Sequence, residues 1–267
     1  RLHVRTPRTP PRCAAARAAA VADSLLEIQR EAEAIGLAGA ELVAAKLGAD
    51  VMKTKASRGD LLTEVDVAVQ EIIEQRVRAK FPDHGFLGEE SVAAGPKASA
   101  DALRAALDAS ESDYLWIVDP IDGTTNFVQG LPLVGISIGV ARRTPAGWEL
   151  AVGCIVDPFS KLGRPEVFSA VSGGGATADG APISVGDETL ADAVVCTGFG
   201  PSEASLRPMV RGISAVGAKA RTVRMLGSAA IMLAWVACGR LSAYFEADLN
   251  AWDMAAGVLL VREAGGV

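Results

Sequence analysis

One segment of the chain limits the possible folds more than any other. Four apolar residues, Leu115 to Val118, run directly into the sequence Asp-Pro-Ile-Asp-Gly at residues 119–123. The apolar run predicts a buried strand, and Pro120 stops it because proline cannot donate to a strand ladder. Two carboxylates are therefore delivered to the open end of a buried strand.

Helical and strand patterns alternate along the rest of the chain. Apolar residues recur at helical spacing over residues 21–47 and again after residues 63–66, where a second amphipathic helix ends before Pro82 and has Asp66 near its start. Apolar patterns also predict strands over residues 115–118, 134–140, 150–156 and 194–197, and helices over residues 228–238 and 252–263. This mixture predicts an α/β or α+β fold.

The composition fits one large globular domain or two tightly joined lobes. Of the 267 residues, 50% are hydrophobic and 22% are charged. The longest apolar runs fall short of the roughly 18 residues that a membrane helix needs. The four cysteines are scattered without a C-x-x-C pair, which indicates neither a disulfide framework nor a thiolate metal site. Because the net charge is −6, we expect a metal ion as a partner rather than nucleic acid. Because the apolar runs are short, we expect no membrane contact.

The N-terminal residues differ in character from the rest of the chain. Residues 1–17 carry five arginines and three prolines but no acidic residue. This pattern is typical of an organellar transit peptide, and a disordered tail is the alternative. We therefore expect residues 1–20 to be a basic disordered tail and residues 21–267 to form the folded domain. A plastid (chloroplast) location follows from the first interpretation, and a cytoplasmic location from the second.

The residues after the predicted strand are suited to hold a cation and a phosphate side by side. Asp119 and Asp122, three positions apart across a turn, can converge on one or two divalent cations, and the Ile121 carbonyl offers a further oxygen ligand. Residues 123–125, Gly-Thr-Thr, supply backbone N–H groups and hydroxyls that suit a phosphate at a turn or helix start. The alternative is that both aspartates are ordinary turn residues and that Thr125 is a helix cap.

Two further acidic positions are candidates for the same site. Glu89 and Glu90 follow a short apolar stretch, and Asp253 stands at the start of a strongly apolar helical pattern. Taken singly, the glutamates are equally explained by a solvated turn. Asp253 is equally explained by the preference of helix N-termini for negative charge.

Three motifs occur in one order: GEES at residues 88–91, WxxDPxDGTxNF at residues 116–127 and WDxAAG at residues 252–257. The chain resembles the inositol monophosphatase family from about residue 20 to its end. The three motifs are hallmarks of that family. The resemblance implies a layered αβαβα sandwich and a phosphoric monoester hydrolase that depends on Mg²⁺ and is sensitive to lithium. It also implies a homodimer.

The resemblance implies a role for each motif residue. The ligands of two to three Mg²⁺ ions would be Glu89, Asp119, the Ile121 carbonyl, Asp122 and Asp253. Thr124, helped by Asp66, would orient the attacking water, while Glu89 would also support a third, weaker ion. The phosphate would contact Gly123, Thr124 and Thr125, and the rest of the substrate would contact Gly227, Ser228, Ala229, Glu246 and Asp253.

The substrate that the resemblance implies is inositol monophosphate, hydrolysed to inositol and phosphate. Related family members leave other substrates open: histidinol phosphate, a sugar bisphosphate or a 3′-phosphonucleotide. A different class, a catalytically silent regulator that binds metal or phosphate, is a further alternative. An acidic Glu246 suits an uncharged polyol hydroxyl and so favours inositol phosphate, unless it is simply an exposed glutamate after a strand.

The chain departs from the family pattern at three places. Residues 158–167 form a somewhat longer connection at a hairpin, which we expect to vary on the solvent side without effect on catalysis. We expect the chain to stop before a further strand and helix that the family normally has after Gly265-Gly266. The basic N-terminal segment is not part of the shared domain. Lys55 matches a basic position near a loop that shapes the metal site, although a single lysine is more often only solvated.

Overall fold

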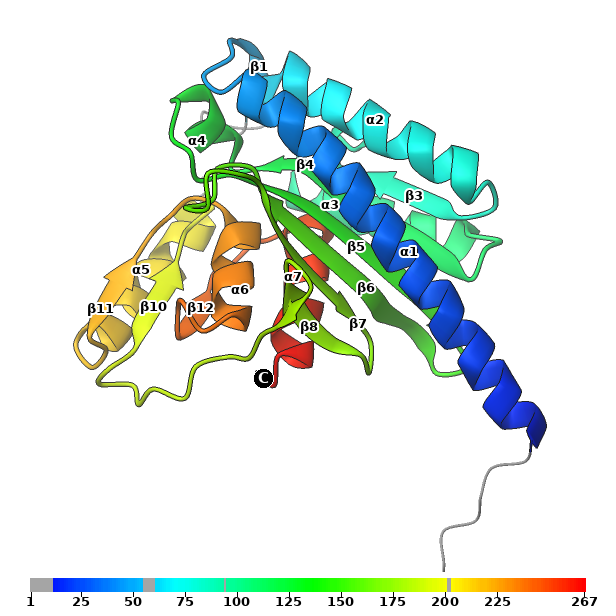
Figure 1. Cartoon of the computed structure of the whole chain (residues 1–267). Coiled ribbons are helices and arrows are strands. Elements are labelled where there is room, and N and C mark those ends of the chain that lie inside the picture. The colour runs from blue at the N-terminus through cyan, green and yellow to red at the C-terminus, as the bar shows by residue number, and fades with distance from the viewer. Residues whose placement is uncertain (1–11, 55–60, 94, 201–202) are drawn as a thin grey trace, which may run out of the picture.

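The computed structural model describes residues 12–54, 61–93, 95–200 and 203–267. A seven-stranded sheet lies at its centre (Figure 1). The strand order is β3-β4-β5-β6-β7-β8-β9; β3 is parallel to β4, and the other neighbours are antiparallel. The strands are β3 (Gly85–Gly88), β4 (Tyr114–Asp122), β5 (Gly135–Thr144), β6 (Gly147–Asp157), β7 (Glu166–Val171), β8 (Gly175–Ala178) and β9 (Ala181–Pro182).

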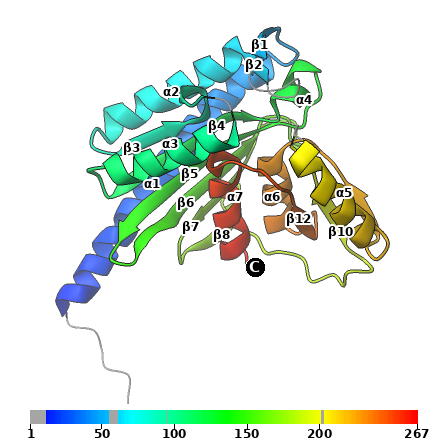
Figure 2. The ribbon, with the colours of Figure 1, turned by 180° about the vertical axis from the view of Figure 1, so that it is seen from behind.

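Two long helices, α1 (Arg12–Ala45) and α2 (Glu64–Lys80), cover one face of this sheet (Figure 1). Their apolar sides pack on alternate residues of the strands, including Trp116 and Val118 of β4. The other face is covered by α3 (Pro96–Ala109), α6 (Ala229–Ala237) and α7 (Ala251–Glu263), and Leu115 and Ile117 point to that side (Figure 2). Strand β4 is thus buried on both faces, which explains its continuous apolar run.

Helix α7 packs close to the sheet because small residues face each other there. A Cβ built on Gly139 of β5 would lie 2.5 Å from the Cβ of Ala255. A Cβ built on Gly153 of β6 would lie 2.6 Å from the carbonyl oxygen of Ala256. The two alanines of the WDxAAG motif therefore serve packing, and the close approach brings the first turn of α7, with Asp253, to the end of β4.

A second, three-stranded parallel sheet lies on the far side of α6. It has the order β11-β10-β12, formed by β11 (Thr222–Arg224), β10 (Val194–Thr197) and β12 (Ala243–Phe245). Cys196 of β10 packs on α6, and α5 (Glu203–Gly217) packs against β12, where a Cβ on Gly212 would lie 2.9 Å from the Phe245 ring. The layers run helices, large sheet, helices, small sheet, helix (Figures 1 and 2). The predicted αβαβα sandwich is confirmed.

Shorter elements gather at one end of the large sheet. The antiparallel pair β1 (Val51–Thr54) and β2 (Leu61–Thr63) precedes α2, η1 (Glu89–Ser91) follows β3, and α4 (Thr124–Val128) follows β4. Figure 1 shows α4 beside β1 at this end. Each strand and helix predicted from the sequence is present. The prediction that Pro120 stops the strand is wrong, because β4 continues through Pro120 to Asp122, with an interruption of its register with β5 between Asp119 and Asp122.

The predicted start of α1 is also wrong. The helix expected to start near residue 21 begins at Arg12, so the expected disordered tail of residues 1–20 is helical over residues 12–20. The reason is the alanine-rich run before residue 21, since alanine favours helix without any apolar periodicity. Residues 1–11 and Lys55 lie outside the described residues. In the described part of the chain, no helix has the length and apolar character needed to cross a membrane.

The connection between β6 and β7 is exposed at its tip, residues 161–164, as expected, but its base is buried. Asp157 and Glu166, which flank residues 158–165, are only 4% and 3% exposed. The Arg240 guanidinium donates to both Glu166 carboxylate oxygens, at 2.8 and 2.6 Å. The exposed tip therefore stands on a buried base, which is ion-paired to Arg240 after α6.

Candidate active site

Four acidic residues from three parts of the chain meet at the carboxyl end of β4. The parallel pairing of β3 with β4 places Glu89, the first residue of η1, beside Asp119. Asp119 and Asp122 end β4, and Asp253 comes from the first turn of α7. One carboxylate oxygen of each aspartate lies within 4.8 Å of those of the other two. We call Asp119, Asp122 and Asp253 the aspartate cluster.

The N-terminus of α6 holds Asp122 in place. The Ser228 hydroxyl donates to Asp122 Oδ2 at 2.6 Å, and the Ala230 N–H donates to the same oxygen at 2.5 Å. Ser228 also caps the helix, because its Oγ accepts from the Ile231 N–H at 3.2 Å. Two hydrogen bonds and the positive end of the helix dipole therefore fix the orientation of this carboxylate.

Asp66 and Asp253 are each held by the start of their own helix. At the start of α7, Asp253 Oδ2 accepts from the Asn250 N–H at 2.6 Å. At the start of α2, Asp66 Oδ2 accepts from the Thr63 N–H at 2.9 Å and from the Thr63 hydroxyl. Both are capping boxes, in which the third helical residue reaches back to the N-cap. The second oxygen of Asp66, Oδ1, points instead to Thr124.

Thr124 starts α4 immediately after the turn that follows Asp122. Its hydroxyl lies 3.3 Å from Asp66 Oδ1 and 3.1 Å from the Ile121 carbonyl oxygen, and it can donate to either. Gly123 makes the turn with φ of 98°, and a Cβ there would lie 3.0 Å from the Gly227 carbonyl oxygen. Glycine is required at this position because other residues are strained at positive φ and would also contact that carbonyl.

Asn126 ties together the two segments predicted to contact the substrate. Its Nδ2 donates to the carbonyl oxygens of Leu133, at 2.8 Å, and Leu226, at 2.7 Å. The second bond holds the turn at residues 226–228 against α4. The structure thus brings together Gly123, Thr124, Thr125, Gly227, Ser228 and Ala229. The asparagine of the TTNF sequence was not identified as a site residue, although its side-chain amide is suited to bridge two carbonyls.

Gln70 is another residue that the sequence analysis missed. It lies one helical turn after Asp66, and its Oε1 accepts from the Glu90 N–H at 2.9 Å while its Nε2 donates to Ser91 Oγ at 3.0 Å. Gln70 therefore holds the short helix η1 that carries Glu89. The available signal was the spacing of four residues from Asp66, which places both side chains on one face of α2.

Glu246 follows β12 at the rim of the site. It is partly buried, and its Oε2 accepts from the Tyr244 hydroxyl at 2.7 Å. Burial raises the pKa of Glu246, and the bond from Tyr244 acts in the opposite direction. The charge of Glu246 in turn contributes to the raised pKa of Asp122. The exposed glutamate expected as the alternative is therefore wrong, because this side chain lies within electrostatic reach of the aspartate cluster.

Burial makes the aspartate cluster unfavourable when every carboxylate is charged. Burial raises the pKa of Asp119 well above its ordinary value, and the charges of Glu89 and Asp122 raise it further. Burial also raises the pKa of Asp122 to about 7, although its bonds from α6 oppose the shift. The pKa of Asp253 rises through burial and the charge of Asp122, and burial raises that of Asp66. Mutual repulsion of buried carboxylates is relieved by protons or by a cation.

The donor atoms of this site fit a hard divalent cation. Carboxylate oxygens, with a backbone carbonyl beside them, are the ligands that Mg²⁺ and similar ions prefer. The mutual repulsion of Asp119, Asp122 and Asp253 gives a reason for such an ion to bind here. The aspartate cluster is therefore a group that could hold a metal ion.

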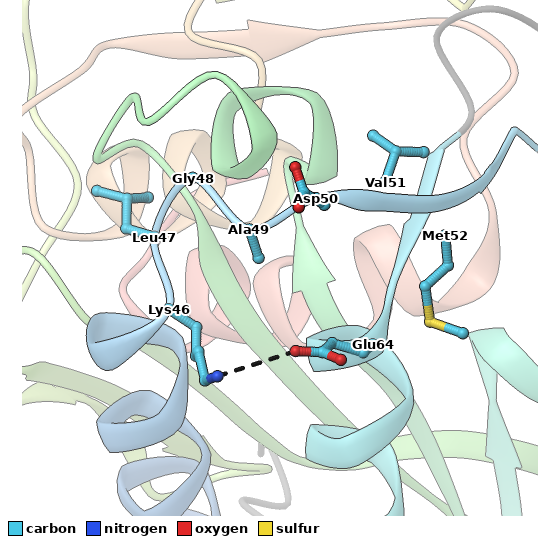
Figure 3. A pocket seen from close by; sticks show the side chains of 8 residues that line it. All are labelled: Lys46, Leu47, Gly48, Ala49, Asp50, Val51, Met52 and Glu64. Carbon is cyan, nitrogen blue, oxygen red and sulfur yellow. Dashed lines mark ion pairs between the residues drawn. The ribbon is translucent and has the colours of Figure 1, made fainter.

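A cavity of about 430 Å³ lies near this site but is separate from it (Figure 3). It is lined by residues 46–50 between α1 and β1, by the first two residues of β1, and by Glu64, which forms an ion pair with Lys46 at 3.8 Å. The Gly48 N–H donates to the Phe127 carbonyl oxygen at 2.9 Å, so this loop packs against α4. Its lining residues are not among those predicted to act in catalysis, and the hydrogen bond from Gly48 shows that the loop supports α4.

Comparison with known proteins agrees with the fold and the motifs. The model of the inositol monophosphatase family matches residues 18–267. The chain is 39% identical over 220 residues to the Nus factor SuhB of Pasteurella multocida (strain Pm70), covering 82% of this chain and 74% of that protein. It is 38% identical over 212 residues to inositol monophosphatase 1 of Solanum lycopersicum, covering 78% of this chain and 71% of that protein.

Among solved structures, the inositol monophosphatase from Anabaena (Nostoc) sp. PCC 7120 is similar with a TM-score of 0.73 and 31% identity. The similarity covers 91% of this chain and 83% of that one. Sequence and structure agree over nearly the whole described chain. The chain therefore belongs to the inositol monophosphatase family, a family of phosphatases.

Proposed function

We propose that this protein hydrolyses inositol monophosphate to inositol and phosphate, with Mg²⁺ as its cofactor. The observation that carries the proposal is the position of the aspartate cluster beside the hydrogen-bonded pair of Thr124 and Asp66. One group offers ligands for a cation, and the other offers a hydroxyl and a proton acceptor. Metal-assisted hydrolysis of a phosphate monoester uses both.

The acidic residues would bind two to three Mg²⁺ ions. Glu89, Asp119 and the Ile121 carbonyl would hold one ion, and Asp119, Asp122 and Asp253 would hold a second. When bound, the metal would lower the pKa of water and neutralise charge that develops on the phosphate oxygens. Asp119 is the most deeply buried member of the aspartate cluster and would serve both ions.

Thr124 and Asp66 would orient the attacking water and remove its proton. If the Thr124 hydroxyl donates to Asp66 Oδ1, its oxygen is left to accept a hydrogen bond from water. As the water oxygen bonds to phosphorus and the ester bond breaks, the water proton would pass to Thr124 Oγ1 and the threonine proton to Asp66 Oδ1. The leaving alkoxide would take a proton from solvent. The raised pKa of Asp66 makes it a better proton acceptor near neutral pH.

The turn at Gly123 and the segment before α6 would bind the substrate. The phosphate would meet Gly123, Thr124 and Thr125, where backbone N–H groups and hydroxyls are available. The Ser228 hydroxyl is already bonded to Asp122, so we propose that residues 227–229 contact the polyol through their backbone atoms. Glu246 would accept from a ring hydroxyl.

A phosphate-release panel tests this function. Inositol 1-phosphate, histidinol phosphate, fructose 1,6-bisphosphate and 3′-phosphoadenosine 5′-phosphate would be compared with Mg²⁺, with excess chelator and with added lithium. We expect inositol 1-phosphate to be preferred, chelator to abolish turnover and lithium to inhibit it, since a small monovalent ion can occupy a magnesium position without supplying its charge. Preference for another substrate would identify a related phosphatase, and no turnover with any of them would favour the silent regulator.

Replacing Gln70 with alanine is expected to raise the Mg²⁺ concentration needed for half-maximal activity by roughly tenfold, as for the loss of a residue that supports a metal ligand. The cause would be the release of η1, which carries Glu89. A magnesium titration of activity measures the effect. Gln29→Ala is the matched control, because Gln29 makes a comparable bond to Ser169 at 2.9 Å. An equal shift in the control would show that the effect is general and not local to η1.

Two further features stay predictions. The homodimer follows from the resemblance to the family. The plastid location depends on the basic N-terminal segment, whose first 11 residues lie outside the described part of the chain.

A further inference from the structure

We propose that Tyr244 and Gly198 position the Glu246 carboxylate and so give the site its preference for phosphate monoesters that carry a hydroxyl donor near the ester. Tyr244 is a positioning residue in this proposal, since it acts through Glu246. We call these three residues the Glu246 clamp. The proposal rests on the proposed function and deepens it, because it assigns the origin of the substrate preference.

Two contacts fix the carboxylate from different sides. Tyr244 and Glu246 are two positions apart at the end of β12, where alternate side chains of an extended chain point the same way. The tyrosine hydroxyl donates to Glu246 Oε2 at 2.7 Å. On the β10 side, the carboxylate lies directly against Gly198: a Cβ built there would be 2.2 Å from Oε2 and 2.6 Å from Oε1. The carboxylate thus occupies a space that exists only because residue 198 has no side chain.

The strands that carry the clamp are held in register by a buried hydroxyl. Thr197, the last residue of β10, is fully buried and donates from Oγ1 to the Phe245 carbonyl oxygen at 2.7 Å. The parallel pairing places Thr197 opposite Phe245 and Cys196 opposite Tyr244. Gly198 and Glu246, the residues that follow these strands, are therefore brought face to face by backbone geometry.

The clamp lies within electrostatic reach of the aspartate cluster. Charges of Asp122 and Asp253 act on Tyr244, and the charge of Glu246 acts on Asp122. The tyrosine donates to Oε2, and no hydrogen bond to Oε1 is present among the described residues, so we propose that Oε1 accepts from the ligand. A fixed, charged acceptor selects for ligands with a hydroxyl donor. A ligand without that donor removes water from the carboxylate and gives it no hydrogen bond in return. A freely rotating carboxylate would lose part of this selectivity through its entropy.

A kinetic comparison of two substrates tests the clamp. Inositol 1-phosphate carries ring hydroxyls, whereas 4-nitrophenyl phosphate is a monoester without them. We expect Tyr244→Phe to raise the KM for inositol 1-phosphate roughly tenfold while kcat changes by less than about twofold. Both constants for 4-nitrophenyl phosphate should change by less than about twofold. Tyr114→Phe is the matched control: Tyr114, at the opposite end of β4 from Asp122, is the other tyrosine of the chain.

Two further variants separate positioning from direct contact or general damage. Gly198→Ala should raise the same KM, because the new methyl group displaces the carboxylate while leaving Tyr244 intact. In a Glu246→Gln background, Tyr244→Phe should add less than about twofold, since a residue that acts through Glu246 has nothing left to position. Thermal midpoints show whether each variant folds. If either Tyr244→Phe or Gly198→Ala does not fold, the other variant tests the clamp.

Each result has one interpretation. Equal effects of Tyr244→Phe on both substrates, or full additivity with Glu246→Gln, would overturn the clamp. Unchanged KM values in both Tyr244→Phe and Gly198→Ala would overturn it as well. If the wild-type enzyme hydrolyses 4-nitrophenyl phosphate but does not prefer inositol 1-phosphate, the proposed function fails first, and the clamp fails with it because there is no hydroxyl preference to explain.

Discussion

An Asp119→Asn variant is expected to lose at least ~10³ in kcat, on the order of 4 kcal/mol of barrier, as for loss of a principal electrostatic stabiliser. Asp119 is the most deeply buried member of the aspartate cluster, 2% exposed, and the charges of Glu89, Asp122 and Asp253 all raise its pKa. Neutralising it removes the carboxylate that we propose serves both metal positions. We therefore expect both proposed metal positions to weaken together, with a raised magnesium requirement beside the lower kcat.

The control is Glu90→Gln, which also removes one negative charge from a motif. The Glu90 backbone is bonded to Gln70, and its carboxylate is not among the three that form the aspartate cluster within the described residues. We expect its kcat to stay within roughly tenfold of the wild type, or about 1.4 kcal/mol. Both variants should fold, and kcat, magnesium dependence and thermal midpoint would be measured side by side. Near-normal turnover in Asp119→Asn with none in Glu90→Gln would reverse the ligand assignment.

The parts of the fold that local sequence determines could be predicted. Strand β4 was predicted because burial on both faces requires an unbroken apolar run. The start of α2 was predicted because Thr63 and Asp66 form a capping box within four consecutive residues. The start of α1 was missed, since an alanine-rich segment forms a helix without the apolar periodicity on which the prediction depended.

The site residues also fall into those that local sequence predicts and those that it does not. Asp119 and Asp122 could be identified because a strand end delivers them together, whereas Asp253 joined them only through the order of three motifs. The supporting contacts could not be predicted, because they link residues far apart in sequence: Ser228 holds Asp122 across 106 positions, and Gly198 meets Glu246 only through the pairing of β10 with β12. Such contacts depend on tertiary packing, which one sequence does not encode as a local pattern.

The metal-free protein is expected to lose stability as the pH rises from about 4 to about 7, and Mg²⁺ should restore it. The pKa of Asp122 is raised to about 7 in the folded state, so the folded protein binds a proton that the unfolded chain has already lost in this range. Stability from such a group is fully present below the unfolded pKa and is lost as the pH rises through the folded one. For Asp122 alone, the loss is on the order of 4 kcal/mol. Asp119 and Asp253, also raised, act in the same direction.

A bound cation would replace those protons, so its stabilising effect should grow with pH. We expect Mg²⁺ to raise the thermal midpoint by roughly 10 °C more at about pH 8 than at about pH 5, from the usual relation between unfolding free energy and midpoint for a chain of this size. Asp122→Asn is the control, because it removes one of the titrating groups and should reduce the pH dependence in chelator, while Asp119 and Asp253 keep the remainder. Asp157, whose pKa is raised to about 6 by burial, titrates away from the aspartate cluster, so its contribution should persist with Mg²⁺ present. If Mg²⁺ raises the thermal midpoint equally at both pH values, the cation does not act by replacing the protons of these buried carboxylates.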